Sequence, residues 1–226
     1  MRLSIIIPAL NEGANITATL QPLQTLRRAG HEIIVVDGGS DDDTARQASP
    51  LSDNVISSLR GRARQMNTGA DAAANDILLF LHADTLLPHN ADKLIVRGMN
   101  QTGKAWGRFD VCLSGRHPML RVVERSMNLR SRLSGIATGD QAMFVKRAMF
   151  EKVGGFPDIP LMEDIALSHQ LKQHSRPLCL STPLVTSSRR WEQHGIMKTI
   201  VLMWHLRLAY YFGADPQQLV KRYYNK

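Results

Sequence analysis

The first half of the chain alternates short apolar runs with segments of helical periodicity, and this alternation constrains the fold more than any other feature. The apolar runs, each expected to be a buried strand, are 3–7, 32–37, 54–57 and 76–81. The helical segments follow Asn15, follow the turn at 38–44, and span 61–74. Strands that alternate with helices form parallel sheets with helices on their faces. The sequence therefore predicts the α/β class with a mostly parallel central sheet.

The second half is less regular and ends in helices. The expected elements are a half-exposed strand at 106–114, helices at 118–133 and 163–173, a strand at 178–185, and helices at 196–212 and 216–224. A length of 226 residues fits one domain with a C-terminal extension. A boundary is expected near Gly103.

The charge balance favours an anionic partner. Lysine and arginine total 28 against 20 aspartates and glutamates, which gives a net charge of +8. Nucleic acid, a phosphorylated substrate and an acidic membrane surface all fit this excess. Aromatic residues make up only 6% of the chain, whereas nucleic-acid surfaces interleave basic and aromatic side chains. We therefore expect no nucleic-acid partner.

The cysteines and the apolar segments indicate a cytoplasmic protein. Cys112 and Cys179 lie far apart, which excludes a disulfide framework and a cysteine-based zinc site. The segment 196–212 is interrupted by Lys198, His205 and Arg207, so it is a poor membrane-spanning helix. Two interpretations stay open for it: peripheral contact with an anionic bilayer at the inner face of the plasma membrane, or packing in the core or against another copy.

Polar residues follow three of the predicted strands. Asn11 and Glu12 follow the first, Asp37 ends the second, and Asp84 follows the strand at 76–81. Ligands of parallel sheets bind at the carboxyl ends of the strands. Asp37, beside two glycines, suits hydrogen bonding to a base or ribose, and Asp84 suits a divalent cation, with His82 as a borderline ligand. The alternative is that Asp37 shapes its turn and Asp84 merely ends a strand.

Three further groups are candidates for binding or catalysis. They are Arg60, Arg62 and Arg64 for phosphate; Glu163 and Asp164 for a general base; and Arg189, Arg190 and Trp191 for a phosphate and a ring. The alternatives are a solvated basic face, two carboxylates that complement a helix dipole, and a surface salt bridge beside a packed indole.

The order of these motifs resembles the family 2 glycosyltransferases of the GT-A fold. The matching motifs are Pro-Ala-Leu-Asn-Glu at 8–12, Val-Asp-Gly-Gly-Ser at 36–40, Gly-Arg-Ala-Arg-Gln-Met-Asn at 61–67, His-Ala-Asp at 82–84 and Glu-Asp at 163–164. The resemblance covers about 1–190, and it implies a single Rossmann-like GT-A domain. In this division 1–102 binds the nucleotide sugar, 103–190 forms the acceptor side, and 191–226 is a helical extension.

The resemblance also implies chemistry: inverting transfer from a nucleoside-diphosphate sugar, expected to be a UDP-sugar, to an acceptor hydroxyl or carboxyl. The acceptor would be a small molecule or a lipid. Asp164 would be the base, with Glu163 beside it, and Asp84 would hold Mn²⁺ or Mg²⁺ on the diphosphate. The implied nucleotide-sugar-binding residues are Pro8, Ala9, Glu12, Asp37, Gly39, Arg62, Arg64, His82, Ala83, Asp84, Arg190 and Trp191.

Details of the motifs resemble a small bacterial subgroup labelled as arsenosugar-biosynthesis-type or carotenoid-acid glucosyltransferases. The sequence departs from the family where His82 replaces the first Asp of an Asp-x-Asp metal motif and Gly38 replaces a second Asp. Weaker metal binding and altered base selectivity are expected. The competing hypothesis is a non-catalytic protein that keeps the fold and binds nucleotide sugars without transferring them.

Overall fold

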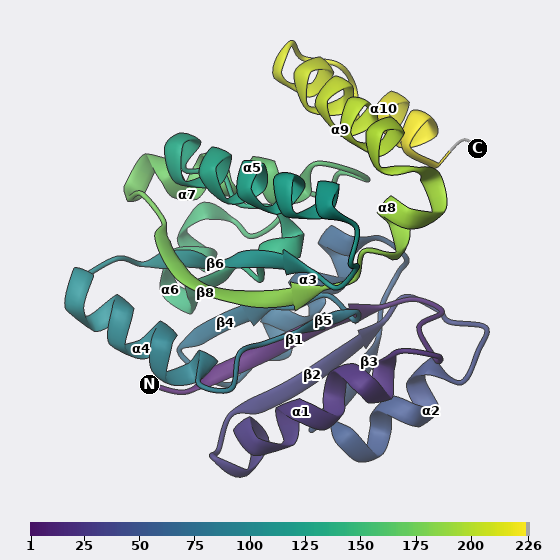
Figure 1. Cartoon of the computed structure of the whole chain (residues 1–226). Helices are drawn as coiled ribbons and strands as arrows, with labels where there is room; N and C mark the ends of the chain where they lie inside the picture. The colour runs from purple at the N-terminus through teal and green to yellow at the C-terminus, as the bar shows by residue number, and fades with distance from the viewer. Residues whose placement is uncertain (225–226) are drawn as a thin grey trace.

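A computed structural model describes residues 1–224 of the chain as one eight-stranded sheet with helices on both faces (Figure 1). The strand order is β3-β2-β1-β4-β7-β6-β8-β5. The bounds are β1 Leu3–Ala9, β2 Glu32–Asp37, β3 Asn54–Ser57, β4 Ile77–Phe80, β5 Thr85–Leu86, β6 Trp106–Leu113, β7 Phe144–Lys146 and β8 Leu178–Thr186. Strands β1 to β4 pair in parallel, and β7 is antiparallel to both of its neighbours. The α/β prediction is confirmed.

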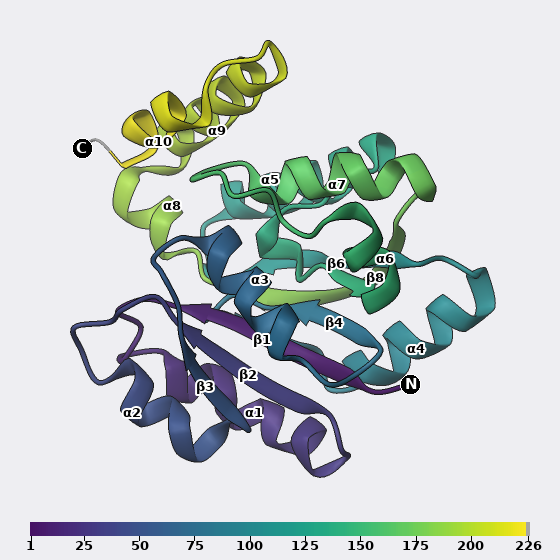
Figure 2. The same ribbon diagram turned by 180° about the vertical axis from the view of Figure 1, so that it is seen from behind.

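The helices agree with most of the expected segments. Their bounds are α1 Ile16–Arg28, α2 Thr44–Ala48, α3 Arg62–Ala72, α4 Ala91–Thr102, α5 Pro118–Ser134, α6 Arg147–Val153, α7 Glu163–His174, α8 Arg189–His194, α9 Ile196–Tyr211 and α10 Pro216–Tyr224. Helix α1 crosses one face of the sheet, and α3 crosses the other when the molecule is seen from behind (Figure 2). Helices α9 and α10 lie together at one end, beyond α5.

Strand β1 shows why the apolar runs are continuous rather than alternating. Ile5 and Ile7 pack into a core shared with α1 and α4, while Ile6 packs into a second core shared with α3, α6 and α7. A strand buried on both faces needs apolar side chains at every position.

Helix α3 is held close to the sheet by Gly69 and Gln65. A Cβ on Gly69 would lie 2.4 Å from Ile6 Cγ2, so only glycine fits there. Gln65 Nε2 donates to the carbonyl oxygens of Ala9 and Val36, both at 2.8 Å. These bonds tie α3 to the ends of β1 and β2, where the site residues begin.

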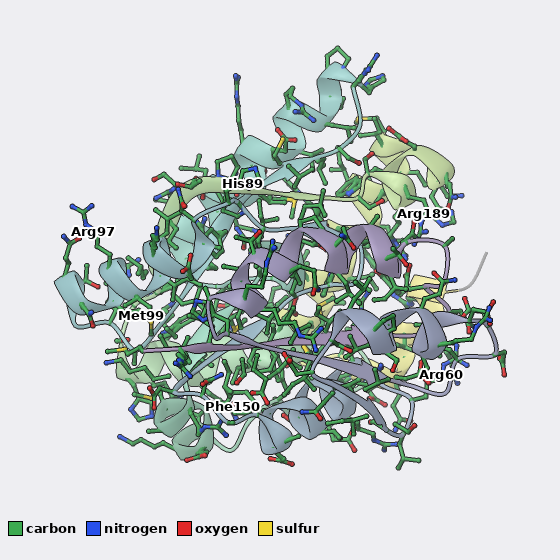
Figure 3. The ribbon with its side chains drawn as sticks, turned by 90° about the horizontal axis from the view of Figure 1, so that it is seen from below. Arg60, His89, Arg97, Met99, Phe150 and Arg189 are labelled. Atoms are coloured by element: carbon green, nitrogen blue, oxygen red, sulfur yellow. The ribbon has the colours of Figure 1, made fainter. Side chains whose placement is uncertain are left out.

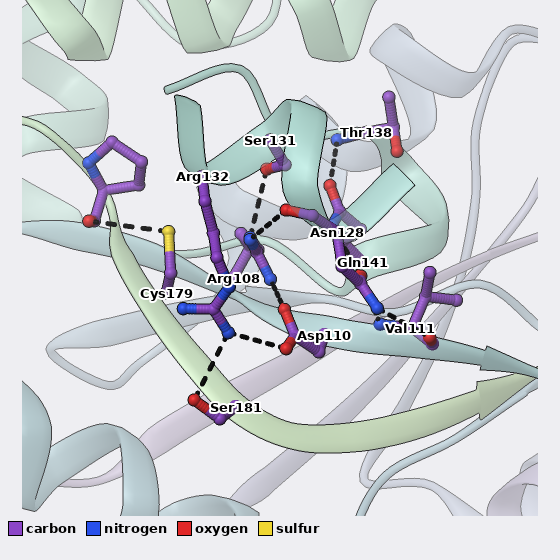
Figure 4. Close-up of polar contacts among 11 residues, drawn as sticks. Arg108, Asp110, Val111, Asn128, Ser131, Arg132, Thr138, Gln141, Cys179 and Ser181 are labelled. Carbon is purple, nitrogen blue, oxygen red and sulfur yellow. Dashed lines mark hydrogen bonds and ion pairs between the residues drawn. The ribbon is translucent and has the colours of Figure 1, made fainter. Parts of the chain in front are cut away.

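Strand β6 corrects one prediction. The sequence predicts it to be half-exposed, but it lies between β7 and β8, and Arg108 is fully buried. The guanidinium donates to Ser131 Oγ at 3.0 Å and to the Asn128 carbonyl oxygen at 3.2 Å, and it forms an ion pair with Asp110 (Figure 4). Arg132 contacts the other oxygen of Asp110 at 2.6 Å. These partners compensate the charge of the buried guanidinium. The alternating sequence pattern could not indicate that such partners would be present, so it predicted an exposed arginine.

Replacing Arg108 with Met is expected to destabilise the fold by about 3 kcal/mol, because it leaves Asp110 with one cation in place of two and removes hydrogen bonds from Ser131 and Asn128. Arg116→Met, at a surface arginine, is the control and should change the free energy of unfolding by less than about 0.5 kcal/mol. Urea denaturation measures both, and equal stability of the Arg108→Met variant and the parent would contradict the prediction.

Candidate active site

The sheet brings the ends of β1, β2 and β4 to one edge, as the parallel arrangement requires. Ala9 and Asp37 are register partners on adjacent strands. The backbone of Leu81, just after β4, donates to Ile6 of β1 at 2.9 Å, so 82–84 leave the sheet at the same edge. Arg60 and Arg189 lie toward this end, opposite Met99 (Figure 3).

Asp37 is buried and engages its own turn. Its Oδ2 accepts from the backbone N–H groups of Gly39, at 3.2 Å, and Ser40, at 3.0 Å, and Oδ1 accepts from the Ser40 hydroxyl. Gly39 has φ +84°, a conformation that glycine adopts without strain. The contacts match the turn-shaping alternative, and the carboxylate retains lone-pair capacity for a further donor. Its role toward a base stays a prediction.

Glu12 links the turn after β1 to the C-terminal part of the chain. Its backbone N–H donates to Thr44 Oγ1 at 2.8 Å, and its carboxylate accepts from Asn15 Nδ2 at 2.9 Å. The other carboxylate oxygen lies 3.5 Å from Arg189 Nη2. Glu12 therefore links α8 to the loops that follow β1 and β2.

His82 and Asp84 differ in what surrounds them. His82 Nδ1 lies 3.4 Å from Asp140 Oδ1, and a Cβ on Gly139 would come within 2.4 Å of His82 Nε2. The ring is therefore packed on the 139–140 turn. The Asp84 carboxylate has a distant contact, 3.5 Å from Thr85 Oγ1, and it is partly exposed.

Asp84 fits a cation that shares its coordination with a substrate. Within residues 1–224, no group of three or more His, Cys, Asp or Glu side chains is arranged to hold a metal ion. Mg²⁺ at nucleotide sites commonly takes one or two carboxylates and completes its shell with phosphate oxygens and water. A single carboxylate at Asp84 suits this mode of binding.

Glu163 and Asp164 begin α7, and they differ in environment. Glu163 is buried, and burial, together with the charge of Asp164, raises its pKa to about 7. Asp164 accepts from the backbone N–H of Gly139 at 2.8 Å and from its own helix at Ile165 N at 2.7 Å. The same glycine that packs against His82 therefore also anchors Asp164.

Three residues near the site were not among the candidates from the sequence: Asp140, Arg130 and Arg207. Burial raises the pKa of Asp140, but the hydrogen bond and charge of His82, followed by the charges of Arg62 and Arg207, outweigh it and hold the pKa below its usual value. Burial lowers the pKa of Arg130 to about 10, against the opposing charge of Asp164. Burial also lowers the pKa of Arg207, opposed by Asp164 and then Asp140.

Only the motif around Asp140 carried a sequence signal, the Thr-Gly-Asp-Gln run at 138–141. Arg130 and Arg207 are two of many basic residues on helices, and nothing in their spacing distinguishes them.

The structure separates the candidate arginines. Arg62, at the start of α3, interacts electrostatically with Asp140 and Glu163, whereas Arg64 forms an exposed ion pair with Asp158 at 2.9 Å. Arg190 donates to the Tyr223 carbonyl oxygen at 3.0 Å, and its guanidinium lies 3.6 Å above the Tyr223 ring. Trp191 packs against the α1-side core. The described contacts of Arg64, Arg190 and Trp191 are thus with residues outside the cluster of His82, Asp140, Glu163 and Asp164.

Comparison with known families identifies the class of protein. The sequence profile of "Glycosyl transferase family 2" matches residues 4–154, so the chain belongs to this family. It is 25% identical over 225 residues to poly-beta-1,6-N-acetyl-D-glucosamine synthase of Staphylococcus aureus strain COL, and 24% over 217 residues to that of Staphylococcus epidermidis. These matches cover 85% and 84% of this chain but 54% and 52% of the relatives. The chain therefore spans about half the length of these relatives.

Solved structures share the GT-A fold. S. aureus TarS 1–349 in complex with UDP-GlcNAc has a TM-score of 0.68 at 19% identity, and the match covers 83% of this chain and 58% of the TarS 1–349 chain. Glucosyl-3-phosphoglycerate synthase from Mycobacterium tuberculosis, in complex with Mn²⁺, UDP and glucosyl-3-phosphoglycerate, has a TM-score of 0.64 at 20% identity. This match covers 95% of this chain and 81% of the synthase chain. These likenesses show the fold. Over residues 1–224, none of the helices is long and apolar enough to cross a membrane.

Proposed function

We propose that the chain is an inverting, metal-assisted glycosyltransferase that moves a sugar from a nucleoside-diphosphate sugar to an acceptor hydroxyl or carboxyl. The donor nucleotide is proposed to be UDP, as in the complexes of TarS and the mycobacterial synthase. Structures of the fold contain Mn²⁺ or Mg²⁺, and Mn²⁺ or Mg²⁺ is proposed here with Asp84 as its protein ligand.

One observation carries the proposal. The 139–140 turn contacts His82, two residues before Asp84, and also holds Asp164 through the Gly139 N–H. The segment proposed to meet the diphosphate and the carboxylate proposed as the base are thus joined by one short turn. A displacement reaction needs these two functions on either side of one sugar.

Each proposed role follows from a residue's place in the site. A bound divalent cation would neutralise charge that develops on the departing diphosphate. With a hydroxyl acceptor, Asp164 takes the proton from the acceptor oxygen as it attacks, whereas a carboxylate acceptor attacks without losing a proton. In both cases attack opposite the leaving diphosphate inverts the anomeric carbon. Arg62 adds positive charge beside Asp140 and Glu163.

The function is tested by donor binding and donor turnover. A thermal-shift screen of nucleoside diphosphates with Mn²⁺ should show stabilisation, greatest for UDP, and slow hydrolysis of the matching UDP-sugar should release UDP. Stabilisation without any release of UDP would instead support a non-catalytic nucleotide-sugar-binding protein.

Asp37→Asn is expected to weaken binding of the preferred nucleotide about tenfold or more with folding intact. The amide presents a donor where the carboxylate accepts, and a mismatched buried polar group costs about 1–3 kcal/mol. Calorimetric titration with UDP and Mn²⁺ measures the affinity. Asp41→Asn, at an exposed neighbour in the same loop, is the control, and equal affinity in Asp37→Asn and the parent would place Asp37 outside the site.

A further inference from the structure

A cavity of about 690 Å³ opens between α5 and α9. Its lining residues are Arg130 of α5 and, from α9, Ile200, Val201, Trp204, His205, Arg207, Leu208 and Tyr211. Its walls are therefore mainly apolar, with two arginines among them. A pocket of this size and composition is typical of sites for small apolar or amphiphilic molecules.

The apolar residues of this wall are not covered by the protein. Val201, Trp204, Leu208 and Tyr211 are between 59% and 78% exposed, although each is large and apolar. Monomeric proteins rarely leave such a group uncovered along one helix without a binding partner. The core-packing interpretation of 196–212 holds for Leu206, which is fully buried, but not for these four residues.

Arg130 is desolvated without full compensation. Its Nε and Nη2 are shielded from solvent and have no hydrogen-bond partner in the described part of the chain. A buried donor without a partner is costly, and a guanidinium more so because it is charged. Arg130 also lines the cavity, so a turn of its side chain would present these donors to an oxyanion there, and guanidinium and oxyanion form strong charge-assisted hydrogen bonds.

Helix α9 packs against the start of α7, because Leu206 lies in one apolar cluster with Met162 and Ile165, the residues on either side of the Glu163-Asp164 pair. Asp164 is the acidic group that interacts with Arg130, and it also interacts with Arg207. Tyr210, three residues after Arg207 along α9, also interacts electrostatically with Asp164. Arg207 follows Leu206 directly, so the polar end of the cavity lies near the start of α7, which carries the proposed base.

We propose that this cavity binds the sugar acceptor, and that the acceptor is an amphiphile with an oxyanion head, a long apolar body and, beside the head, the hydroxyl group that Asp164 deprotonates as it attacks the sugar. The head lies at Arg130 and Arg207, and the body lies along Val201, Trp204 and Leu208. This inference rests on the proposed function, because the acceptor role requires Asp164 to be the base.

The binding test uses Trp204 as its reporter. Trp106 is fully buried and Trp191 is partly buried, so the exposed Trp204 responds most to a ligand in the cavity. The probes are dodecyl phosphate, dodecan-1-ol and inorganic phosphate, kept below micelle-forming concentrations. We expect dodecyl phosphate to shift tryptophan emission to shorter wavelengths and to bind at least tenfold more tightly than dodecan-1-ol, with no shift from phosphate alone.

Matched variants separate the head from the body. Arg130→Gln should weaken dodecyl phosphate at least tenfold and leave dodecan-1-ol unchanged, whereas Arg125→Gln, on an exposed part of α5, should change neither. Leu208→Ser should weaken binding of both long-chain probes. Leu133→Ser, at another exposed leucine that does not line the cavity, should weaken neither. Leu208 is on the surface, so this variant is informative even where Arg130→Gln fails to fold.

Three outcomes would overturn the proposal. They are no response to dodecyl phosphate in a chain that binds UDP with Mn²⁺, equal affinity for the two long-chain probes, and a dimer in light scattering that Leu208→Ser dissociates. The last result would show that a second copy covers α9. Titration with UDP and Mn²⁺ on the same samples distinguishes failure of the proposed function from failure of this inference. A parent protein that binds dodecyl phosphate but not UDP would contradict the glycosyltransferase function while still supporting an amphiphile site.

Discussion

Asp164→Asn is expected to lower the rate of sugar transfer by about 10²–10⁴-fold, the range that positioned general bases contribute. The amide is nearly the same size as the carboxylate and can still accept from the Gly139 N–H, which now lies 2.8 Å from Oδ2. It cannot take a proton from the acceptor at neutral pH. Donor affinity should barely change, because the diphosphate is assigned to Asp84. Single-turnover transfer and calorimetric donor titration measure the two quantities separately.

Glu163→Gln is the matched control for this prediction. Transfer should survive in this variant if Asp164 is the base, and the two phenotypes will exchange if Glu163 is. Full transfer activity in both variants would reject the assignment and leave these carboxylates as complements of the α7 dipole.

Glu163→Gln should also change how the free energy of unfolding depends on pH. The pKa of Glu163 rises from 4.5 to about 7 on folding, first because of burial and then because of Asp164. A carboxyl whose pKa is raised in the folded state makes its full contribution to stability below pH 4.5, its pKa in the unfolded chain. This contribution is lost as the pH rises through 7. Glu163→Gln should therefore flatten the decline in unfolding free energy between these two pH values.

The parallel half of the fold follows closely from the sequence, whereas the short elements do not. Strands β1, β2 and β4 are continuous apolar runs because each is buried on both faces. Strand β7 has three residues and β5 has two, too few for any period to show. Helix α4 was not predicted, although Ala91, Ile95 and Met99 are buried at a spacing of four.

The candidate site also has a part that the sequence predicts and a part that it does not. Asp37 and Asp84 could be placed together because the carboxyl ends of parallel strands meet at one edge. Arg130 of α5 and Arg207 of α9 interact electrostatically with Asp164, and their positions depend on how those helices pack, which spacing along the chain does not encode. The motifs indicated Arg62 and Arg64 alike, yet one faces the carboxylates and the other Asp158, because neighbours on a helix point in different directions.

Asp84→Ala is expected to abolish the Mn²⁺-dependent part of nucleoside-diphosphate binding. Asp84 is the only carboxylate of the shortened His-Ala-Asp motif, and its side chain approaches Thr85 Oγ1 at 3.5 Å. Within residues 1–224 the carboxylate therefore makes no strong internal bond that a cation would have to break. Oxygen ligands suit Mn²⁺ and Mg²⁺, and an alanine supplies none.

His82→Ala is the matched comparison, and it should weaken Mn²⁺-dependent binding less than Asp84→Ala does. The imidazole is already engaged with Asp140 at 3.4 Å and packed on Gly139, whose N–H holds Asp164. Its removal should therefore disturb the base more than the cation, so that transfer falls by a larger factor than donor affinity. Calorimetric titration of UDP with Mn²⁺ and with EDTA isolates the metal-dependent term for each variant. An unchanged difference between the two titrations in Asp84→Ala would show that the cation, where it binds, is held by other groups.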